Sequence, residues 1–542
     1  MRTAKPEPAP IPTGALPKGW TWGRIEDVVG PKGVYIDGDW VESKDQDPDG
    51  DVRLIQLADV GDGYYVNKSN RFLTAAKARE LGCTFLQTGD VLVARMPDPL
   101  GRACIFPGDK KQAVTVVDVC IARSGSPDVD HQWLMHAINA PSFRTAIGFL
   151  QSGSTRARIS RGNLSTLWLP VPPSKEQQRI VAALDERLSE LDASVASLER
   201  AERNLVRYRA AVLAAACSGK LVPTEANLAR RAGRSYESAD QLLARILAER
   251  RKANTKAKYE EPAQPDTSKL PKLPEGWAWA TMGQMADVRL GKMLSAKARE
   301  ASLEMRPYLR NENVRWGWVD TSDLKVMGFE SDEITRYTVN QGDLVICEGG
   351  EAGRCAVYRA PASIMYQKAI HRLRPYGDLV SVDFLQRVFE CGVKQGRWFP
   401  RFSETTIQHL PQEKLLAVAV PLPPVAEQER IIAEVERHLS RADALAASIA
   451  QSKRRAQRLR RAILAAAFQG RLVPQDPNDE PASVLLDRIR AQAATAEAAT
   501  AAAPRRGRPA AQPAAPVASA SPPAMTPKRR GRPPGSKNKA KA

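Results

Sequence analysis

The sequence has few of the residues from which metal centres and disulfide frameworks are built. Five histidines and seven cysteines are dispersed over 542 residues, and no CxxC pair occurs. His131 and His136 stand five residues apart, whereas two ligands on one helix face stand four apart. Structural zinc requires closely spaced Cys and His ligands, and disulfide frameworks use even, patterned cysteines. We therefore expect reduced thiols in the core and no bound metal.

Long apolar stretches are missing as well. No run of about 18 apolar residues is present, which argues against a membrane-spanning helix. The first residues, MRTAKPEPAPIPTGALP, are rich in proline and lack the apolar centre of a secretory signal. We expect a cytoplasmic protein.

Motifs of nucleotide-dependent enzymes do not occur either. We find no G-x-x-x-x-G-K-[ST] phosphate loop and no G-x-G-x-x-G turn after a strand. The Asn/Asp-Pro-Pro-aromatic motif of an amino-methyltransferase is also absent, and no group of carboxylates forms a recognisable constellation. We expect a chain without catalytic residues and without a cofactor of its own.

Positive charge, by contrast, is abundant. The formal net charge is +19, and ten Lys and Arg residues with no acidic residue lie between Pro504 and Ala542. The remaining surplus of nine positive charges (19 − 10) lies in the body of the chain. A surplus of this size favours a polyanionic partner, most commonly nucleic acid.

An internal repeat of about 250 residues organises the chain. Six segments return in the same order, with an offset that drifts only from 257 to 243 residues. The pairs are LPKGWTW (16–22) with LPEGWAW (273–279), TGDVLVAR (88–95) with QGDLVICE (341–348), GRACIF (101–106) with GRCAVY (353–358), PVPPSKEQQRI (170–180) with PLPPVAEQERI (421–431), LAAACSGKLVP (213–223) with LAAAFQGRLVP (464–474), and ESADQLLARI (237–246) with EPASVLLDRI (480–489). Because solenoids repeat every 20–50 residues, this is a duplicated unit of domain size.

Each copy begins with a globular part and continues as a long helix. Short apolar and β-branched runs between Gly, Pro and Asp turns predict a mixed α/β fold for the globular parts. The predicted segments are a disordered N-terminus (1–15), a first globular domain (16–173), a first long helix (174–222), a connector with a short helix (223–272), a second globular domain (273–424), a second long helix (425–474), a short helix (475–492) and a disordered tail (493–542).

The apolar residues of both long helices recur with steps of three and four. One seam runs through Leu184, Leu188, Leu191, Val195, Leu198, Glu202, Leu205, Arg209 and Val212, and the other through Val435, Leu439, Ala442, Ala446, Ile449, Lys453, Ala456, Arg460 and Ile463. This spacing is a heptad, which lets two helices wind around each other. Glu202 and Lys453 occupy the same repeat position with opposite charge. We expect an antiparallel coiled coil within the chain; the alternative is two separate amphipathic helices, each packed on its own globular part.

Taken together, these motifs resemble the specificity subunit of type I restriction-modification enzymes. The resemblance covers residues 16–492 and rests on the two LP-x-GW openings, the PPSKEQQRI and PPVAEQERI junctions and the two helix ends. It implies that each globular part is a target-recognition domain for one half of a split, asymmetric DNA site. It further implies that the helices set the spacing and dock two methyltransferase subunits, which two restriction subunits can join. S-adenosylmethionine, ATP and magnesium would then bind those partners. The alternative is a freestanding DNA-binding scaffold or regulator without enzyme partners.

Three segments are candidates for DNA contact, because Arg reads guanine, Asn reads adenine, and hydroxyl and backbone groups hold phosphates. In the first globular part the candidate segment is 152–164, with Arg156, Arg158 and Arg161. In the second the candidate segments are 306–318, with Arg310, Asn311, Asn313 and Arg315, and 394–406, with Lys394, Arg397 and Arg401. The alternatives are a solvated basic loop and, around Arg310, a strand end whose tryptophans belong to the core.

The tail contains two RGRP sequences, Arg506–Pro509 and Arg530–Pro533. They resemble AT-hooks, in which Arg506, Arg508, Arg530 and Arg532 would enter a narrow A·T minor groove. The alternative is a polybasic tail that raises DNA affinity by counterion release.

Overall fold

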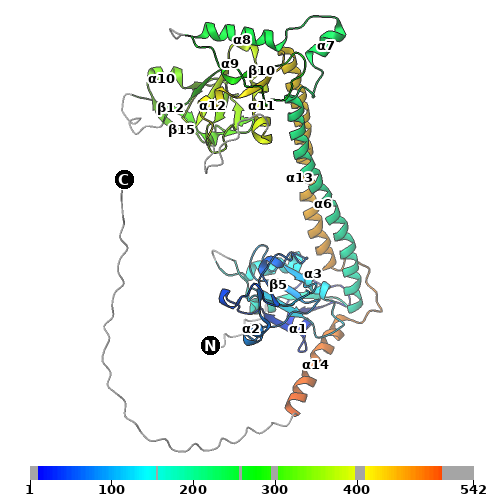
Figure 1. Cartoon of the computed structure of the whole chain (residues 1–542). Helices are drawn as coiled ribbons and strands as arrows, with labels where there is room; N and C mark the ends of the chain where they lie inside the picture. The colour runs from blue at the N-terminus through cyan, green and yellow to red at the C-terminus, as the bar shows by residue number, and fades with distance from the viewer. Residues whose placement is uncertain (1–9, 154–156, 255–258, 294–302, 397–408, 503–542) are drawn as a thin grey trace, which may run out of the picture. The chain divides into compact units, whose positions relative to one another are not determined.

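The computed structural model describes residues 10–153, 157–254, 259–293, 303–396 and 409–502, with the backbone alone for 493–502 (Figure 1). The chain divides into two compact units. Unit 1 comprises Met1–Asn139, Phe143–Gln177 and Pro477–Ala542, and unit 2 comprises Ala140–Ser142 and Gln178–Asp476. Helices and small sheets alternate in both, so the predicted mixed α/β class is confirmed.

Unit 1 is built on two small sheets and a strand pair. Its elements are β1 (Thr21–Arg24), α1 (Ile25–Val29), β2 (Val34–Asp37), β3 (Val52–Ile55), β4 (Phe72–Leu73), α2 (Ala75–Glu80), β5 (Val91–Ala94), β6 (Ala103–Ile105), β7 (Gln112–Thr115), β8 (Val119–Arg123), α3 (His131–Asn139), α4 (Pro141–Leu150), α5 (Arg161–Ser165), β9 (Trp168–Val171) and α14 (Ala482–Ala502). The sheets have the orders β2-β8-β5-β6 and β4-β3-β7, and β1 pairs with β9. Every residue of the inner strand β5 is buried, as its sequence VLVA predicts for a strand covered on both faces.

Unit 2 contains the same arrangement of strands. Its elements are α7 (Glu225–Ala232), α8 (Ala239–Ala253), β10 (Ala278–Thr281), α9 (Met282–Met285), β11 (Ala286–Leu290), β12 (Glu304–Leu309), β13 (Val314–Arg315), β14 (Trp318–Val319), β15 (Lys325–Phe329), α10 (Ser331–Arg336), β16 (Thr338–Val339), β17 (Leu344–Cys347), β18 (Cys355–Val357), β19 (Ile364–Tyr366), β20 (Ile370–Pro375), α11 (Val382–Gln395), α12 (Gln412–Leu416) and β21 (Ala419–Leu422). The sheet with the order β11-β20-β17-β18 corresponds strand by strand to β2-β8-β5-β6 of unit 1. The sheet with the order β15-β12-β19 corresponds to β4-β3-β7 and has β16 as an additional edge strand. The pair of β10 with β21 corresponds to that of β1 with β9.

Equivalent ion pairs fix the sheets of the two units. Arg123 at the end of β8 binds Asp90 at 2.5 Å, and Arg374 near the end of β20 binds Asp343 at 2.7 Å. Both aspartates are nearly fully buried and precede the central strand of their sheet. A buried carboxylate needs such a partner, because removing it from water without one is costly.

Equivalent hydrogen bonds also tie each opening tryptophan to the start of a long helix. The indole N–H of Trp20 donates to Glu176 at 3.0 Å, and that of Trp277 donates to Glu427 at 2.8 Å. Burial raises the pKa of the Glu427 carboxyl. The tryptophans therefore pack each globular part rather than offering their rings to a ligand.

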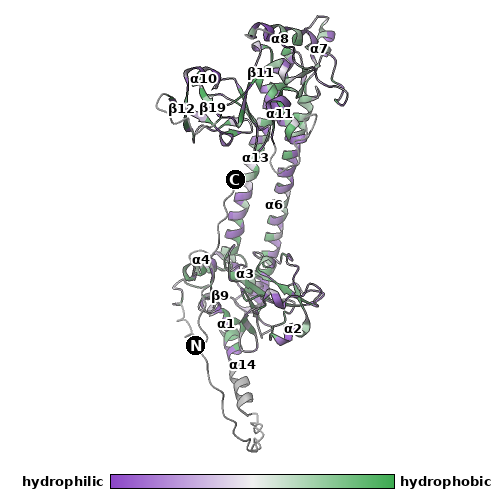
Figure 2. Ribbon diagram, turned by 60° about the vertical axis from the view of Figure 1, so that its left-hand side comes forward, coloured by the Kyte–Doolittle hydropathy of each residue, from purple (hydrophilic) through white to green (hydrophobic). Residues whose placement is uncertain are grey.

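The long helices are α6 (Ser174–Cys217), of 44 residues, and α13 (Val425–Ala467), of 43 residues. Each begins directly after a Pro-Pro pair, as expected because proline suits the start of a helix and disfavours its interior. Both end before the expected boundaries at 222 and 474. Figure 2 shows hydrophilic residues over much of their length, in contrast to the apolar strands of the globular parts.

Within unit 2, α13 and the part of α6 from Gln178 onward lie side by side. Ion pairs join Asp192 to Arg460, Glu202 to Lys453, and Arg209 to Asp443. The residue numbers of the partners fall along α13 as they rise along α6, so the two helices are antiparallel. The Glu202–Lys453 pair, at 2.6 Å, joins the two residues that share a repeat position.

Helices α8 and α14 occupy equivalent places in different units. The N–H of Ala239 donates to the carbonyl of Gly276 at 2.9 Å in unit 2, and that of Ala482 donates to Gly19 at 2.8 Å in unit 1. In Figure 1, α14 lies beside α1. Helix α14 reaches Ala502, ten residues beyond the predicted boundary at 492, because alanine has the highest helix propensity.

All seven cysteines are buried, and none of them forms a disulfide. Burial raises the pKa of the Cys104 thiol to about 12, which keeps it protonated and unreactive. No helix in the described part of the chain is long and apolar enough to cross a membrane.

Candidate DNA interface

A pocket of about 380 Å³ lies in unit 2 where three strands end. Residues that follow β12, β17 and β19 line it, and His409 closes it from the segment before α12. Its polar side chains are Asn311, Glu348, Gln367, Lys368 and His409. We call this set the unit 2 pocket. Carboxamide, carboxylate and ammonium groups are those that read base edges and hold phosphates in DNA complexes.

Asn311 is the predicted residue that the structure places in the pocket. Its side-chain N–H donates to the carbonyl of Gly349 at 3.1 Å, whereas its buried oxygen has no hydrogen-bond partner among the described residues. An unsatisfied buried acceptor is costly. A ligand with a donor group, such as the exocyclic amine of adenine or cytosine, would satisfy it.

Two neighbouring predicted residues support the fold instead. Arg310 is 11% exposed and binds Glu312 at 2.6 Å and Asp323 at 2.8 Å. Asn313 is 2% exposed, and its side-chain oxygen accepts from the Arg310 N–H at 2.9 Å. Arg315 is exposed in the β13–β14 hairpin. Of these three predicted residues, Arg315 is the most accessible to DNA.

An arginine cluster lies in the corresponding region of unit 1. Arg158 binds Asp118 at 2.6 Å, and Arg161 lies 3.4 Å from Asp37. Buried Arg95 also faces Asp37, at 3.3 Å. Three guanidinium groups against two carboxylates leave one positive charge, and both Arg158 and Arg161 remain partly exposed.

Backbone hydrogen bonds show which positions of the two regions are equivalent. The N–H of Ile159 donates to the carbonyl of Arg95 at 3.1 Å, and the N–H of Leu410 donates to that of Glu348 at 2.7 Å. Arg95 therefore corresponds to Glu348, and Arg158 to His409. The two units carry different side chains on the same backbone arrangement.

The last predicted segment is described only at its start. Lys394 lies in the final turn of α11, where it binds Glu390 at 2.7 Å and lies 4.7 Å from the ring centre of Trp316. The other predicted arginines lie outside the described residues: Arg156, Arg397, Arg401, Arg506, Arg508, Arg530 and Arg532.

Sequence reasoning did not find Glu348, Gln367, Lys368 or His409. Parallel pairing of β12 with β19 brings Gln367 near Asn311 from more than 50 residues away. One signal was present: Glu348 ends the segment QGDLVICE, where the first copy has Arg95. A charge reversal inside a repeated segment marks a position that the fold does not constrain.

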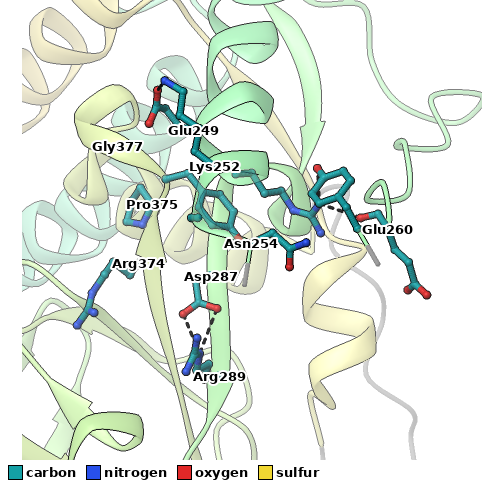
Figure 3. Close-up of a pocket in the computed structure, with 13 residues that line it drawn as sticks. Glu249, Lys252, Asn254, Glu260, Asp287, Arg289, Arg374, Pro375 and Gly377 are labelled. Carbon is teal, nitrogen blue, oxygen red and sulfur yellow. Dashed lines mark hydrogen bonds and ion pairs between the residues drawn. The ribbon is translucent and has the colours of Figure 1, made fainter. Parts of the chain in front are cut away.

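A larger pocket, of about 770 Å³, lies between α8 and the strands β11 and β20 (Figure 3). Its lining includes Asp287, which binds Arg289 at 2.9 Å, and Arg374, which binds Asp343. Since acids already pair these cations, the pocket is a weaker anion site than its composition suggests. Across the described ranges, no group of three His, Cys, Asp or Glu residues is placed to hold a metal ion.

Residues 274–451 match the family model of the type I restriction modification DNA specificity domain. The specificity subunit of the type I restriction enzyme EcoBI from Escherichia coli is 25% identical over 389 residues, 69% of this chain and 74% of the relative. The EcoKI specificity subunit from E. coli strain K12 is 24% identical over 377 residues, 67% of this chain and 72% of the relative.

The chain is similar to the specificity subunits of type I restriction enzymes.

A solved chain from a type I R-M system has this fold, with a TM-score of 0.55 and 17% identity over 84% of this chain and 100% of that one. The family model covers the second globular part and α13 as far as residue 451, including the unit 2 pocket. The pocket thus lies within the region that the family names a DNA specificity domain.

Proposed function

We propose that this chain is the DNA-recognition subunit of a type I restriction-modification complex and reads a split, asymmetric DNA site. One observation carries the proposal: two units with the same strand order and the same internal bonds differ in the side chains at equivalent positions of the candidate interface. Arg95 and Arg158 in unit 1 stand where Glu348 and His409 stand in unit 2. A common scaffold with different base-reading groups suits two different half-sites.

The DNA-contacting residues that we propose follow from exposure and pairing. In unit 1 they are Arg158 and Arg161, with Arg156 in the adjoining segment. In unit 2 they are Asn311, Arg315 and Lys394, with Arg397 and Arg401 in the adjoining segment. Arg310 and Asn313 act through the fold, by holding the segment that carries Asn311. Two half-sites on one chain bind together more tightly than either does alone.

The long helices form an antiparallel coiled coil in this proposal, and the tandem duplication supplies one helix to each half of it. The seam spacing and the three cross-helix ion pairs support it. The coil fixes the gap between the half-sites and docks two methyltransferase subunits, which two restriction subunits join. Methylation and cleavage take place on those partners, which bind S-adenosylmethionine, ATP and magnesium. We expect the complex to act in the cytoplasm.

The RGRP sequences of the tail add a separate element to the proposal. Arg506, Arg508, Arg530 and Arg532 would hold A·T-rich DNA in the minor groove near the recognition site. Removing residues 503–542 should therefore lower affinity without changing the motif.

Single-molecule sequencing of host DNA tests the proposal, with the gene intact, deleted, and replaced by variants. We expect methylation at one split motif to disappear on deletion. Arg158→Ala should relax or abolish only one half of the motif, because base discrimination by one residue contributes about 1–3 kcal/mol. Arg79→Ala, at an exposed position of α2, is the matched control. A methylation pattern that deletion leaves unchanged would favour a freestanding DNA-binding protein.

A further inference from the structure

Each unit exposes a large aromatic ring at the tip of an equivalent hairpin. Tyr64 in unit 1 is 64% exposed, and Trp318 in unit 2 is 55% exposed. Their positions correspond because Val60 pairs with Tyr65 as Val314 pairs with Val319. Solvated rings of this size at the same place in two divergent units require an explanation, since aromatic side chains usually bury most of their surface.

The hairpins have the same construction. The N–H of Gly63 donates to the carbonyl of Ala103 at 2.9 Å, and the N–H of Gly317 donates to that of Cys355 at 3.1 Å. Both glycines have positive φ, 91° and 83°, a conformation that favours glycine. Each glycine directly precedes the exposed ring. In both units a hydrogen-bonded turn thus fixes the backbone of the residue that carries the exposed ring.

The hairpins lie beside the segments predicted to contact DNA. In unit 2, Trp316 of the hairpin lies against Lys394, the first residue of the predicted segment 394–406. In unit 1, Asp62 of the hairpin binds Arg144 at 2.5 Å, on the helix that leads into the predicted segment 152–164.

Charged residues of both signs lie near the ring tips, and the acids beside the hairpins have arginine partners. Arg144 pairs with Asp62, and Arg310 pairs with both Glu312 and Asp323. Arg315 pairs across the hairpin with Trp318 and is exposed beside it. An exposed ring next to an exposed guanidinium group suits a surface that has both charge and apolar faces, which a DNA groove offers.

We propose that Tyr64 and Trp318 are DNA contacts, each entering a groove of its own half-site and packing its ring against deoxyribose and base edges. The assignment rests on the proposed function and names a contact of that same interface. Apolar wedges of this kind stabilise DNA complexes through contact area. Because each ring belongs to one unit, the two contributions should be independent and additive.

Equilibrium binding tests the proposal, using the chain in complex with its methyltransferase. Four duplexes serve as probes: the methylated motif found by sequencing, the motif with the first or the second half-site scrambled, and the motif with both scrambled. Trp318→Ala should weaken binding about tenfold, or about 1.4 kcal/mol, on duplexes that keep the half-site read by unit 2. On the duplex that keeps only the other half-site, its affinity should equal that of the unaltered chain. Tyr64→Ala should show the reverse pattern.

Conservative and control variants sharpen the result. Trp318→Phe and Tyr64→Phe should retain most of the affinity, because the ring and its apolar area remain. Val326→Ala in β15 removes an exposed apolar side chain from the same unit and should leave binding unchanged. Unfolding temperatures should be the same for all variants.

Two results would overturn the proposal. One is affinity within twofold of the unaltered chain for both alanine variants on all four duplexes. The other is loss of the methyltransferase from the complex, which would make the hairpins protein-docking elements. If the unaltered complex fails to distinguish the intact from the doubly scrambled motif, the proposed function itself fails. A tenfold loss in the alanine variants on every duplex would then indicate ring contacts without sequence specificity.

Discussion

The spacing role that we propose for the two long helices leads to a quantitative prediction. A heptad inserted between Asp192 and Glu202 in α6, and another between Lys453 and Arg460 in α13, leaves the ion pairs on both sides of the insertion in register. Seven residues at ~1.5 Å each lengthen the coil by about 10 Å. At ~3.4 Å per base pair, the gap of the recognised motif should grow by about three base pairs.

The rotation of DNA adds a second expectation. Three base pairs are about a third of a helical turn of roughly 10–10.5 base pairs, so the second half-site turns away from its domain and methylation should be weak. Three heptads add about 31 Å, or about nine base pairs, close to one full turn. We expect this longer variant to methylate its lengthened motif more efficiently than the single-heptad variant does.

Single-molecule sequencing of DNA from cells that carry each variant reads the gap directly. A heptad inserted in α6 alone is the matched control; it breaks the cross-helix register and should lower both the unfolding temperature and methylation. The spacing argument is refuted if the doubly lengthened chains keep normal helix content and unfolding temperature but methylate the original gap.

Two further predictions concern stability. Glu427→Ala leaves the indole N–H of Trp277 and the backbone N–H of Glu225 without an acceptor. Each unsatisfied donor lowers the free energy of unfolding by about 1–3 kcal/mol, so calorimetry should show a lower unfolding temperature. Burial raises the pKa of the Glu427 carboxyl above 4.5, so the folded chain binds the carboxyl proton more tightly than the unfolded chain does. Protonation of Glu427 therefore stabilises the fold below pH 4.5, and this stabilisation is lost as the pH rises through the raised pKa. Glu427→Gln should flatten that part of the stability curve in melts across pH. Lys453→Glu should destabilise the chain by about 0.2–1 kcal/mol, and adding Glu202→Lys should restore stability; a double variant no more stable than the single one would contradict the pairing.

The features that sequence reasoning predicted best are those with a period or a repeat. The starts of the two long helices followed from the Pro-Pro pairs that precede them. The mixed α/β class followed from short β-branched runs between turn residues. Such patterns are local, so no knowledge of distant contacts was needed.

The candidate site was harder to predict, because distant pairing assembles it. Asn311 was singled out for its residue type, but its neighbours in the pocket come from two other strand ends. Arg310 and Asn313 have the composition of a DNA-contact segment and instead stabilise the turn before β13. Whether a basic side chain meets an acid of its own fold depends on the tertiary structure, which composition does not reveal.

Helix α14, at the end of the repeated region, packs on the start of the first copy. The hydrogen bond from Ala482 to Gly19 joins the end of the repeated region to its beginning, just as Ala239 joins Gly276 at the boundary between the copies. The two junctions are made alike, although the chain passes through only one of them. These two junctions therefore do not fix the order of the copies, and we expect a chain with the second copy first to form the same fold.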